Sequence, residues 1–274
     1  MPTVSAGTVS VHFAEVGQGE PVVLVHSGPA TGAQWRGVCD ALKDRYRCLA
    51  IDLYGMGGTD PWPDGQPITL DHEAELVRAL IAACDRFVHL VGHSYGGAVS
   101  IRAVLAGERR VRSLTLIEPA AYLLLPLAGE PALFAEAIRV GEAFLDAAGR
   151  GAEEEGWEGC LDHYNGPGTW KALPEAARAG FRAKTPLISA KWRALMSNPT
   201  RLEQCQTLAL PTLVLWGGQS HVPERRVAEI LASLVPGWRH EVLNGAGHMS
   251  PLTHPAEVSA AIRRHLDRVS AGDW

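Results

Sequence analysis

The 274-residue sequence has no run of about 18 apolar residues, the length that a membrane-spanning helix needs, so we expect no membrane insertion. It also lacks clusters of lysine and arginine, and its formal net charge is −5, so we expect no nucleic acid partner. The first residues carry neither a basic segment nor a long apolar stretch, the two features of a secretory signal. We therefore expect a cytoplasmic protein.

Cysteine is scarce and scattered. The chain has five cysteines, an odd number, and no two have the C-x-x-C spacing of zinc and redox motifs. We expect neither a disulfide framework nor a metal site, and no cofactor. Free and mostly buried thiols in a reducing compartment are the simpler interpretation. The five residues are Cys39, Cys48, Cys84, Cys160 and Cys205.

Short apolar segments alternate with segments of helical periodicity along most of the chain. This alternation predicts an α/β fold, with a mostly parallel sheet covered by helices. Thr69 is a candidate cap for the helix that follows it. Strands are predicted at residues 8–15, 21–25, 47–52, 87–91, 114–117, 212–216 and 241–243, and helices at 34–42, 70–84, 98–106 and 255–269.

One region departs from this alternation. Residues 122–208 show helical patterns at 133–147, 174–181 and 186–196, and no convincing strand. We therefore predict a core domain formed by residues 1–121 and 209–274, with a helical cap at 122–208. The aromatic residues of the cap either line an apolar pocket or pack the cap against the core domain. They are Trp157, Tyr164, Trp170 and Trp192.

A catalytic motif lies between a predicted strand and a predicted helix. The segment Gly92-His93-Ser94-Tyr95-Gly96 matches G-x-S-x-G, in the strand–turn–helix context that this motif requires. The sharp turn lifts the serine above the sheet, and Gly92 and Gly96 let the strand and the helix approach closely. The first amides of the helix favour negative charge at this point. Ser94 is therefore the candidate nucleophile.

With this motif in place, the whole chain resembles cap-bearing α/β-hydrolases, the group of carboxylesterases, lactonases, haloperoxidase-like enzymes and C–C bond hydrolases. The resemblance covers nearly the whole chain, although the cap matches only in type. It implies an α/β-hydrolase fold. It also implies that His248, in Gly245-Ala246-Gly247-His248 after the last strand, is the general base. Of the rival histidines, His93 is expected to pack beside the nucleophile and His254 to shape the start of the last helix, while His221 is a further alternative.

The acid that orients the histidine is the point where the chain departs from the family. The order in this fold is serine, acid, histidine, and the acid usually lies in a stretch G-x-x-D. Here that stretch is Gly217-Gly218-Gln219-Ser220, and a serine cannot supply the charge that stabilises an imidazolium. Some relatives carry the acid one strand earlier, where this chain has Glu118. We predict Glu118 as the acid. Glu224 is a weaker alternative, and a third is that no acid completes the site.

A further segment implies the donors that stabilise an oxyanion. Val25-His26-Ser27-Gly28-Pro29 resembles the H-G-x-P segment of the family, with Ser27 where glycine is usual. The resemblance implies the backbone amides of Gly28 and Tyr95 as donors, with Ser27 as the alternative to Gly28. Asp52 also matches the family and is expected to hold its loop by hydrogen bonds.

These expectations predict a serine hydrolase that acts on a small-molecule substrate, namely a small or medium carboxylic ester or a lactone, through Ser94, His248 and Glu118. One alternative is a small-molecule binding protein or sensor on the same scaffold, which the serine at position 220 favours. Another is cofactor-free C–C bond hydrolysis or perhydrolysis. Ser94 argues against dehalogenases and epoxide hydrolases, whose nucleophile is an aspartate. The natural substrate and the oligomeric state are not indicated.

Overall fold

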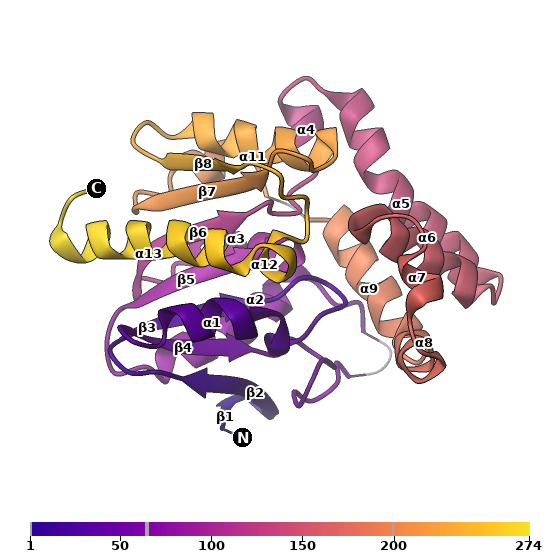
Figure 1. Ribbon diagram of the computed structural model, residues 1–274, viewed down its shortest axis with the longest axis horizontal. Coiled ribbons are helices and arrows are strands. Elements are labelled where there is room, and N and C mark those ends of the chain that lie inside the picture. The colour runs from indigo at the N-terminus through magenta and orange to yellow at the C-terminus, as the bar shows by residue number, and fades with distance from the viewer. Residues whose placement is uncertain (1, 64–65, 199) are drawn as a thin grey trace.

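The computed structural model describes residues 2–63, 66–198 and 200–274. Within these residues, eight strands form one sheet in the order β1-β2-β4-β3-β5-β6-β7-β8 (Figure 1). Strand β2 pairs antiparallel with β1 and with β4, and all other neighbours are parallel. The predicted mostly parallel sheet is therefore confirmed. The strands are β1 (Thr3–Ala6), β2 (Val9–Val16), β3 (Glu20–Val25), β4 (Tyr46–Ile51), β5 (Val88–His93), β6 (Val111–Ile117), β7 (Thr212–Gly217) and β8 (Arg239–Leu243).

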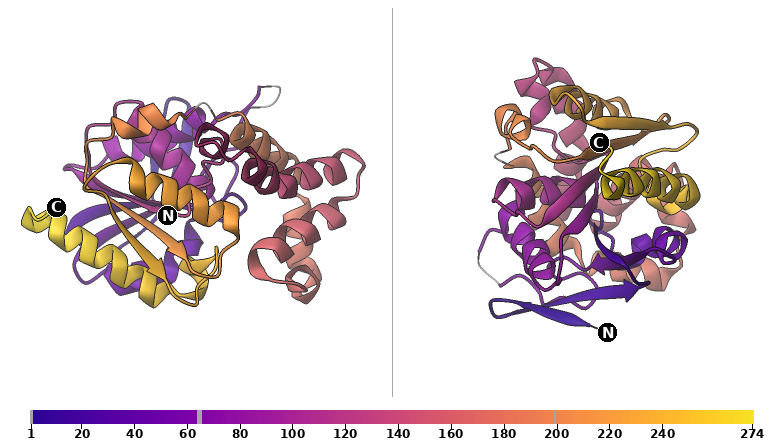
Figure 2. Two further views of the ribbon diagram at one scale, coloured as in Figure 1. Left: turned by 90° about the horizontal axis from the view of Figure 1, so that it is seen from above. Right: turned by 90° about the vertical axis from the view of Figure 1, so that its left-hand side faces the viewer.

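Helices cover both faces of the sheet, which is why its central strands are apolar throughout rather than alternating. In β3, Val22 and Leu24 belong to the core under α1 and α13, whereas Val23 and Val25 belong to the core under α2, α3 and α11 (Figures 1 and 2). These helices are α1 (Arg36–Leu42), which continues the short 3-10 helix η1 (Gly32–Trp35), α2 (Leu70–Ala82), α3 (Tyr95–Leu105), α11 (Val222–Leu234) and α13 (Pro255–Ala271).

The predicted cap of α2 is present. The Thr69 hydroxyl accepts a hydrogen bond from the amide of His72 at 3.3 Å, and the His72 ring accepts one from the Thr69 amide at 3.2 Å. This reciprocal pair satisfies two amides at the start of the helix, which would otherwise have no partner inside it. It fixes the start of α2, and therefore the position of Glu73 in its first turn.

The described chain between β6 and β7 forms a helical insertion beside the ends of the parallel strands (Figure 1). Its described residues contain helices and no strand. The helices are α4 (Leu124–Leu127), α5 (Pro131–Gly149), α6 (Glu153–Asn165), α7 (Thr169–Ala172), α8 (Glu175–Arg182), α9 (Thr185–Met196) and α10 (Leu202–Gln206). A last short helix, α12 (Ser250–Thr253), precedes α13.

The insertion has a small core of its own. Trp157 and Trp170 are buried there, together with Phe144 and with Met56 from the core domain. Of the four aromatic residues expected to line a pocket or to pack the cap, Trp157 and Trp170 therefore pack inside the insertion, while Tyr164 and Trp192 line a pocket.

Two further properties concern the whole of the described chain. None of its helices is both long and apolar enough to cross a membrane. All five cysteines are free and buried, as expected.

Trp157 is the residue to test in the insertion. Its ring centroid lies 5.0 Å from that of Phe144 and 4.9 Å from that of Phe181, and its indole N–H donates to the Thr185 hydroxyl at 2.9 Å. We expect Trp157→Ala to lower the free energy of unfolding by about 3–5 kcal/mol in chemical denaturation, because it leaves a cavity and an unpaired hydroxyl. Trp274→Ala is the control, since Trp274 is 65% exposed. Equal losses in the two variants would contradict the packing role.

Candidate active site

Ser94 occupies the sharp turn between β5 and α3. Its backbone has φ 53° and ψ −119°, a conformation that costs free energy in any residue other than glycine. The turn fits because its flanking glycines carry no side chain. A Cβ at Gly92 would lie 2.4 Å from the Ser100 hydroxyl, and one at Gly96 would lie 2.3 Å from the Val25 carbonyl oxygen. The close approach expected at both glycines is therefore confirmed.

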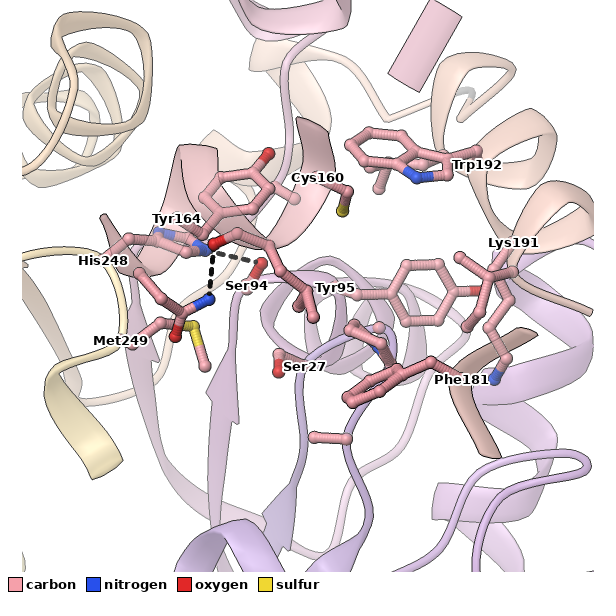
Figure 3. Close-up of a pocket in the computed structure, with 18 of the residues that line it drawn as sticks. Ser27, Ser94, Tyr95, Cys160, Tyr164, Phe181, Lys191, Trp192, His248 and Met249 are labelled. Carbon is pink, nitrogen blue, oxygen red and sulfur yellow. Dashed lines mark hydrogen bonds between the residues drawn. The ribbon is translucent and has the colours of Figure 1, made fainter. Parts of the chain in front are cut away.

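The structure brings Ser94, His248 and Glu118 into one hydrogen-bonded chain. The Ser94 hydroxyl lies 3.0 Å from Nε2 of His248 (Figure 3), and Nδ1 of His248 lies 2.7 Å from Oε2 of Glu118. With a proton on Nδ1, the imidazole donates to the carboxylate, and its Nε2 accepts the serine proton. These contacts join the ends of β5 and β6 to the loop that follows β8.

Ser220, which stands where the family usually has an aspartate, contacts the acid instead of replacing it. The Ser220 hydroxyl and the Gly217 amide both donate to Oε1 of Glu118, each at 2.6 Å. Glu118 itself has φ 40°, and it and Ser94 are the two residues other than glycine with positive φ in the described chain. Both carboxylate oxygens of this buried side chain are therefore satisfied.

The charges of the pair support each other. Burial alone raises the pKa of Glu118, but the hydrogen bond and charge of His248, with the donors from Gly217 and Ser220, hold that pKa below its ordinary value. Burial alone lowers the pKa of His248, but the hydrogen bond and charge of Glu118, with a smaller contribution from the charge of Glu224, outweigh this effect and raise that pKa above 6.5. The site thus favours a negative Glu118 and a His248 that readily takes up a proton.

His93 has a positioning role that the sequence did not reveal. Its Nε2 donates to the backbone carbonyl of His248 at 2.9 Å, and its Nδ1 accepts from the Gln34 amide group at 3.1 Å. Burial lowers the pKa of His93 to about 3, so the ring is neutral near pH 7 and can make both contacts. The expected packing role is therefore incomplete, because His93 also holds the backbone of the candidate base.

Gln34 connects the same network to Ser27, the residue before the candidate oxyanion donor Gly28. Its side-chain oxygen accepts from the amide of Ser27 at 3.1 Å and from the Ser27 hydroxyl at 2.7 Å. The Ser27 amide therefore already has an acceptor, which favours Gly28 over Ser27 as the oxyanion donor. In the described chain, the amides of Gly28 and Tyr95 have no protein acceptor, and both residues line the pocket that contains Ser94. Free backbone N–H groups are the kind of donor that a developing oxyanion needs.

The rival residues lie elsewhere or make other contacts. Glu224 is buried in the first turn of α11, where it accepts a hydrogen bond from the Tyr122 hydroxyl at 3.0 Å. Nε2 of the exposed His221 bonds to the carbonyl of His163, and His254 precedes α13, as expected. Asp52 accepts from the amides of two glycines, Gly32 at 2.7 Å and Gly58 at 3.0 Å, which confirms its expected role in holding its loop.

A mostly apolar cavity of about 200 Å³ extends from Ser94 and His248 between the core domain and the insertion (Figure 3). This volume lies below the range typical of drug-sized ligands, which suits a small substrate. Among the described residues, no group of three or more His, Cys, Asp or Glu side chains is arranged to hold a metal ion. Besides the residues already named, the lining includes Ala120, Phe181, Ile188, Lys191, Leu195, Met249 and Leu252.

Comparison with known families identifies the chain. Residues 22–261 match the family model described as the alpha/beta hydrolase family. The chain belongs to this family. Solved hydrolases share this fold over nearly the whole chain.

Individual relatives differ in their described activities. The chain is 31% identical over 265 residues to the polyketide synthase ThaQ of Burkholderia thailandensis, but it spans 12% of that protein's length. It is 28% identical to 2-hydroxy-6-oxo-6-(2'-aminophenyl)hexa-2,4-dienoic acid hydrolase of Metapseudomonas resinovorans, over 97% of this chain and 90% of that one. A thermophilic esterase from Thermogutta terrifontis has a TM-score of 0.74, with 23% identity and 98% of each chain covered.

The electrostatic coupling predicts how His248 titrates. In the wild type, the imidazole should titrate with a midpoint above 6.5, because Glu118 stabilises its protonated form. In Glu118→Gln that effect is lost and burial remains, so the midpoint should fall below that of the wild type. NMR of the ring nitrogens measures both values. Glu241→Gln, at an exposed ion pair with Arg264, is the control. Equal midpoints in the wild type and Glu118→Gln would show that the carboxylate does not set the charge of His248.

Proposed function

We propose that the protein is a serine hydrolase that cleaves small carboxylic esters or lactones through an acyl-enzyme. The observation that carries this proposal is the continuous chain of hydrogen bonds from the Ser94 hydroxyl through His248 to Glu118, with distances of 3.0 Å and 2.7 Å. A serine hydroxyl is a weak nucleophile near neutral pH and needs a base within this distance. Membership of a hydrolase family supports the same reaction class.

In the first half of the reaction, Oγ of Ser94 attacks the substrate carbonyl carbon while its proton passes to Nε2 of His248. Glu118 keeps the other proton on Nδ1 and stabilises the imidazolium that forms. The carbonyl oxygen becomes an oxyanion that accepts from the amides of Gly28 and Tyr95, which are fixed before the charge develops. The carbon–oxygen bond to the alcohol then breaks, and the leaving oxygen takes the proton from His248.

In the second half, water replaces the alcohol. His248 removes a proton from this water, whose oxygen attacks the acyl carbon, and the same two amides hold the second oxyanion. The bond to Ser94 breaks, and its oxygen regains the proton from His248. For a lactone, the alcohol and the acid are parts of one product.

The environment of Glu118 argues against the alternative of a binding protein or sensor. That alternative depended on the serine at position 220, where the family usually has an aspartate. Here the Ser220 hydroxyl donates to Glu118, so the position supports an acid from the neighbouring strand. A protein that only bound small molecules would have no need of a buried carboxylate aligned with His248.

C–C bond hydrolysis is a second candidate, because the chain matches the dienoic acid hydrolase over most of both lengths. Both reactions use a serine, a histidine and an acid, so the site geometry does not separate them. The rates measured with one substrate of each class distinguish the two reactions. We expect p-nitrophenyl butyrate to be hydrolysed at least about a hundredfold faster, in kcat/KM, than a 2-hydroxy-6-oxohexa-2,4-dienoic acid is cleaved.

Removal of each member of the chain should affect p-nitrophenyl ester hydrolysis to a different degree. Ser94→Ala and His248→Ala should each lower kcat by about 10⁶-fold, and Glu118→Gln by about 10⁴-fold, since the histidine loses its orienting charge. Glu224→Gln is the control for Glu118→Gln, because the Glu224 carboxylate accepts a hydrogen bond from Tyr122 and not from His248. This variant should lower kcat by less than about tenfold. If Glu224→Gln lost more activity than Glu118→Gln, the assignment of the acid would be wrong.

Ser220 offers a finer test of the same assignment. Ser220→Ala removes one of the two donors to Oε1 of Glu118, and a hydrogen bond to a charged group contributes about 1.5–3 kcal/mol. We therefore expect kcat/KM to fall by about tenfold, while Ser233→Ala, at a hydroxyl that bonds the Ile230 carbonyl in α11, should have no effect. Full activity in Ser220→Ala would mean that the Gly217 amide suffices to hold Glu118.

A further inference from the structure

The apolar pocket contains one charged side chain that the proposed mechanism does not use. Lys191, on α9 of the insertion, lines the pocket and has 2% of its side chain exposed. Its ammonium pairs with Oε1 of Glu73, on α2 of the core domain, at 2.5 Å. Removing two charges from water costs several kcal/mol per ion, and apolar side chains often fill such a place as well or better. A purely structural role therefore accounts poorly for this pair.

The hydrogen-bonding capacity of the pair is uneven. The Glu73 carboxylate accepts from the Tyr54 amide at 3.1 Å and from the Tyr95 hydroxyl at 3.3 Å, in addition to Lys191. An ammonium has three N–H groups. Within the described chain, Lys191 has Glu73 as its acceptor and otherwise lies 5.2 Å from the centroid of the Tyr95 ring. The unused donors of the pair therefore belong to Lys191, the partner that lines the pocket.

Lys191 and the candidate catalytic residues lie in different parts of the same pocket. Figure 3 shows Lys191 beside the Tyr95 ring, with Ser94 and His248 on the other side of that ring. Apolar side chains from the insertion, including Ile188 and Trp192, line the pocket around it. A substrate held at Ser94 and lying along these apolar side chains would extend toward Lys191.

We propose that Lys191 selects substrates with an uncharged hydrogen-bond acceptor, such as a keto, amide or ether oxygen, at the end remote from the scissile carbonyl. The inference rests on the proposed ester hydrolysis. An uncharged acceptor fits because the charges of Lys191 and Glu73 cancel, so the pair offers a donor without excess positive charge. A substrate carboxylate would instead bring a second negative charge beside Glu73, without a cation of its own, into an apolar cavity.

Three p-nitrophenyl esters whose acyl chains are each five non-hydrogen atoms long test this preference: the pentanoate, the 4-oxopentanoate and the hemisuccinate. The fourth carbon of the acyl chain is then a methylene, a ketone or a carboxylate. Homologues one and two methylenes longer vary the distance of this group from the scissile carbonyl. At the best length, kcat/KM for the oxo ester should exceed the value for the alkyl ester by about tenfold to a hundredfold, the effect of a hydrogen bond to a charged donor. It should exceed the value for the carboxylate ester by at least as much.

A charge-balanced double variant then assigns the preference to Lys191. Lys191→Met combined with Glu73→Gln removes the donor without leaving a buried unpaired charge, and it should bring the oxo-to-alkyl ratio to within about threefold of one. Lys171→Met combined with Glu158→Gln is the matched control, because this ion pair lies on the surface of the insertion, with 72% of the Lys171 side chain exposed. The control should keep the wild-type ratio.

The outcomes separate this inference from the proposed function. The inference alone is overturned if the wild type hydrolyses these esters in a Ser94-dependent way but shows no preference for the oxo ester, or prefers the hemisuccinate. It is also overturned if the double variant keeps the preference. The wild-type ratios require no variant to fold. If the wild type hydrolyses none of the esters, the proposed function fails, and the inference fails with it.

Discussion

The hydrogen bond between Nδ1 of His248 and Oε2 of Glu118 is the contact on which the rest of the site depends. It places a charged pair in the interior, so each partner needs the other to offset the cost of burial. The fold provides for this at two strand ends: Glu118 directly follows β6 in a strained backbone conformation, and Gly217 at the end of β7 and Ser220 just after it supply donors. In the proposed site the acid comes from one strand earlier than usual, and Ser220, at the usual acid position, donates to it.

The same histidine is held from its backbone side. His93 donates to the His248 carbonyl, and Gln34 links His93 to Ser27, the residue before the candidate oxyanion donor Gly28. The proposed base and acid and the segment before Gly28 therefore belong to one buried network, whose groups are oriented before a substrate arrives. Such preorganisation is the usual source of a large electrostatic contribution to catalysis, because little reorganisation remains for the reaction step. Apolar side chains of the insertion close the site, and Lys191 of the insertion pairs with Glu73 of α2 beside it.

Local sequence was sufficient where the physical constraint was local. Apolar periodicity predicted most of the strands and covering helices. The glycines of the motif predicted the turn at Ser94, where an added Cβ would collide with neighbouring backbone or side-chain atoms. Helix α6 was missed because Gly156 and Gly159 weaken its helix propensity, which the packing of Trp157 overrides. The contact of Ser220 with Glu118 spans 102 positions in sequence, and that of Lys191 with Glu73 spans 118, so neither leaves a local pattern.

The most direct test of the central claim is the rate at which a fluorophosphonate modifies Ser94, measured by intact-protein mass and located by peptide mapping. This reagent reports the activated nucleophile without any assumption about the natural substrate. The account predicts a single modification at Ser94 in the wild type, and a rate at least about a hundredfold lower in Glu118→Gln, because His248 then loses its orienting charge. Modification of Glu118→Gln at the wild-type rate, or modification at another residue, would contradict it.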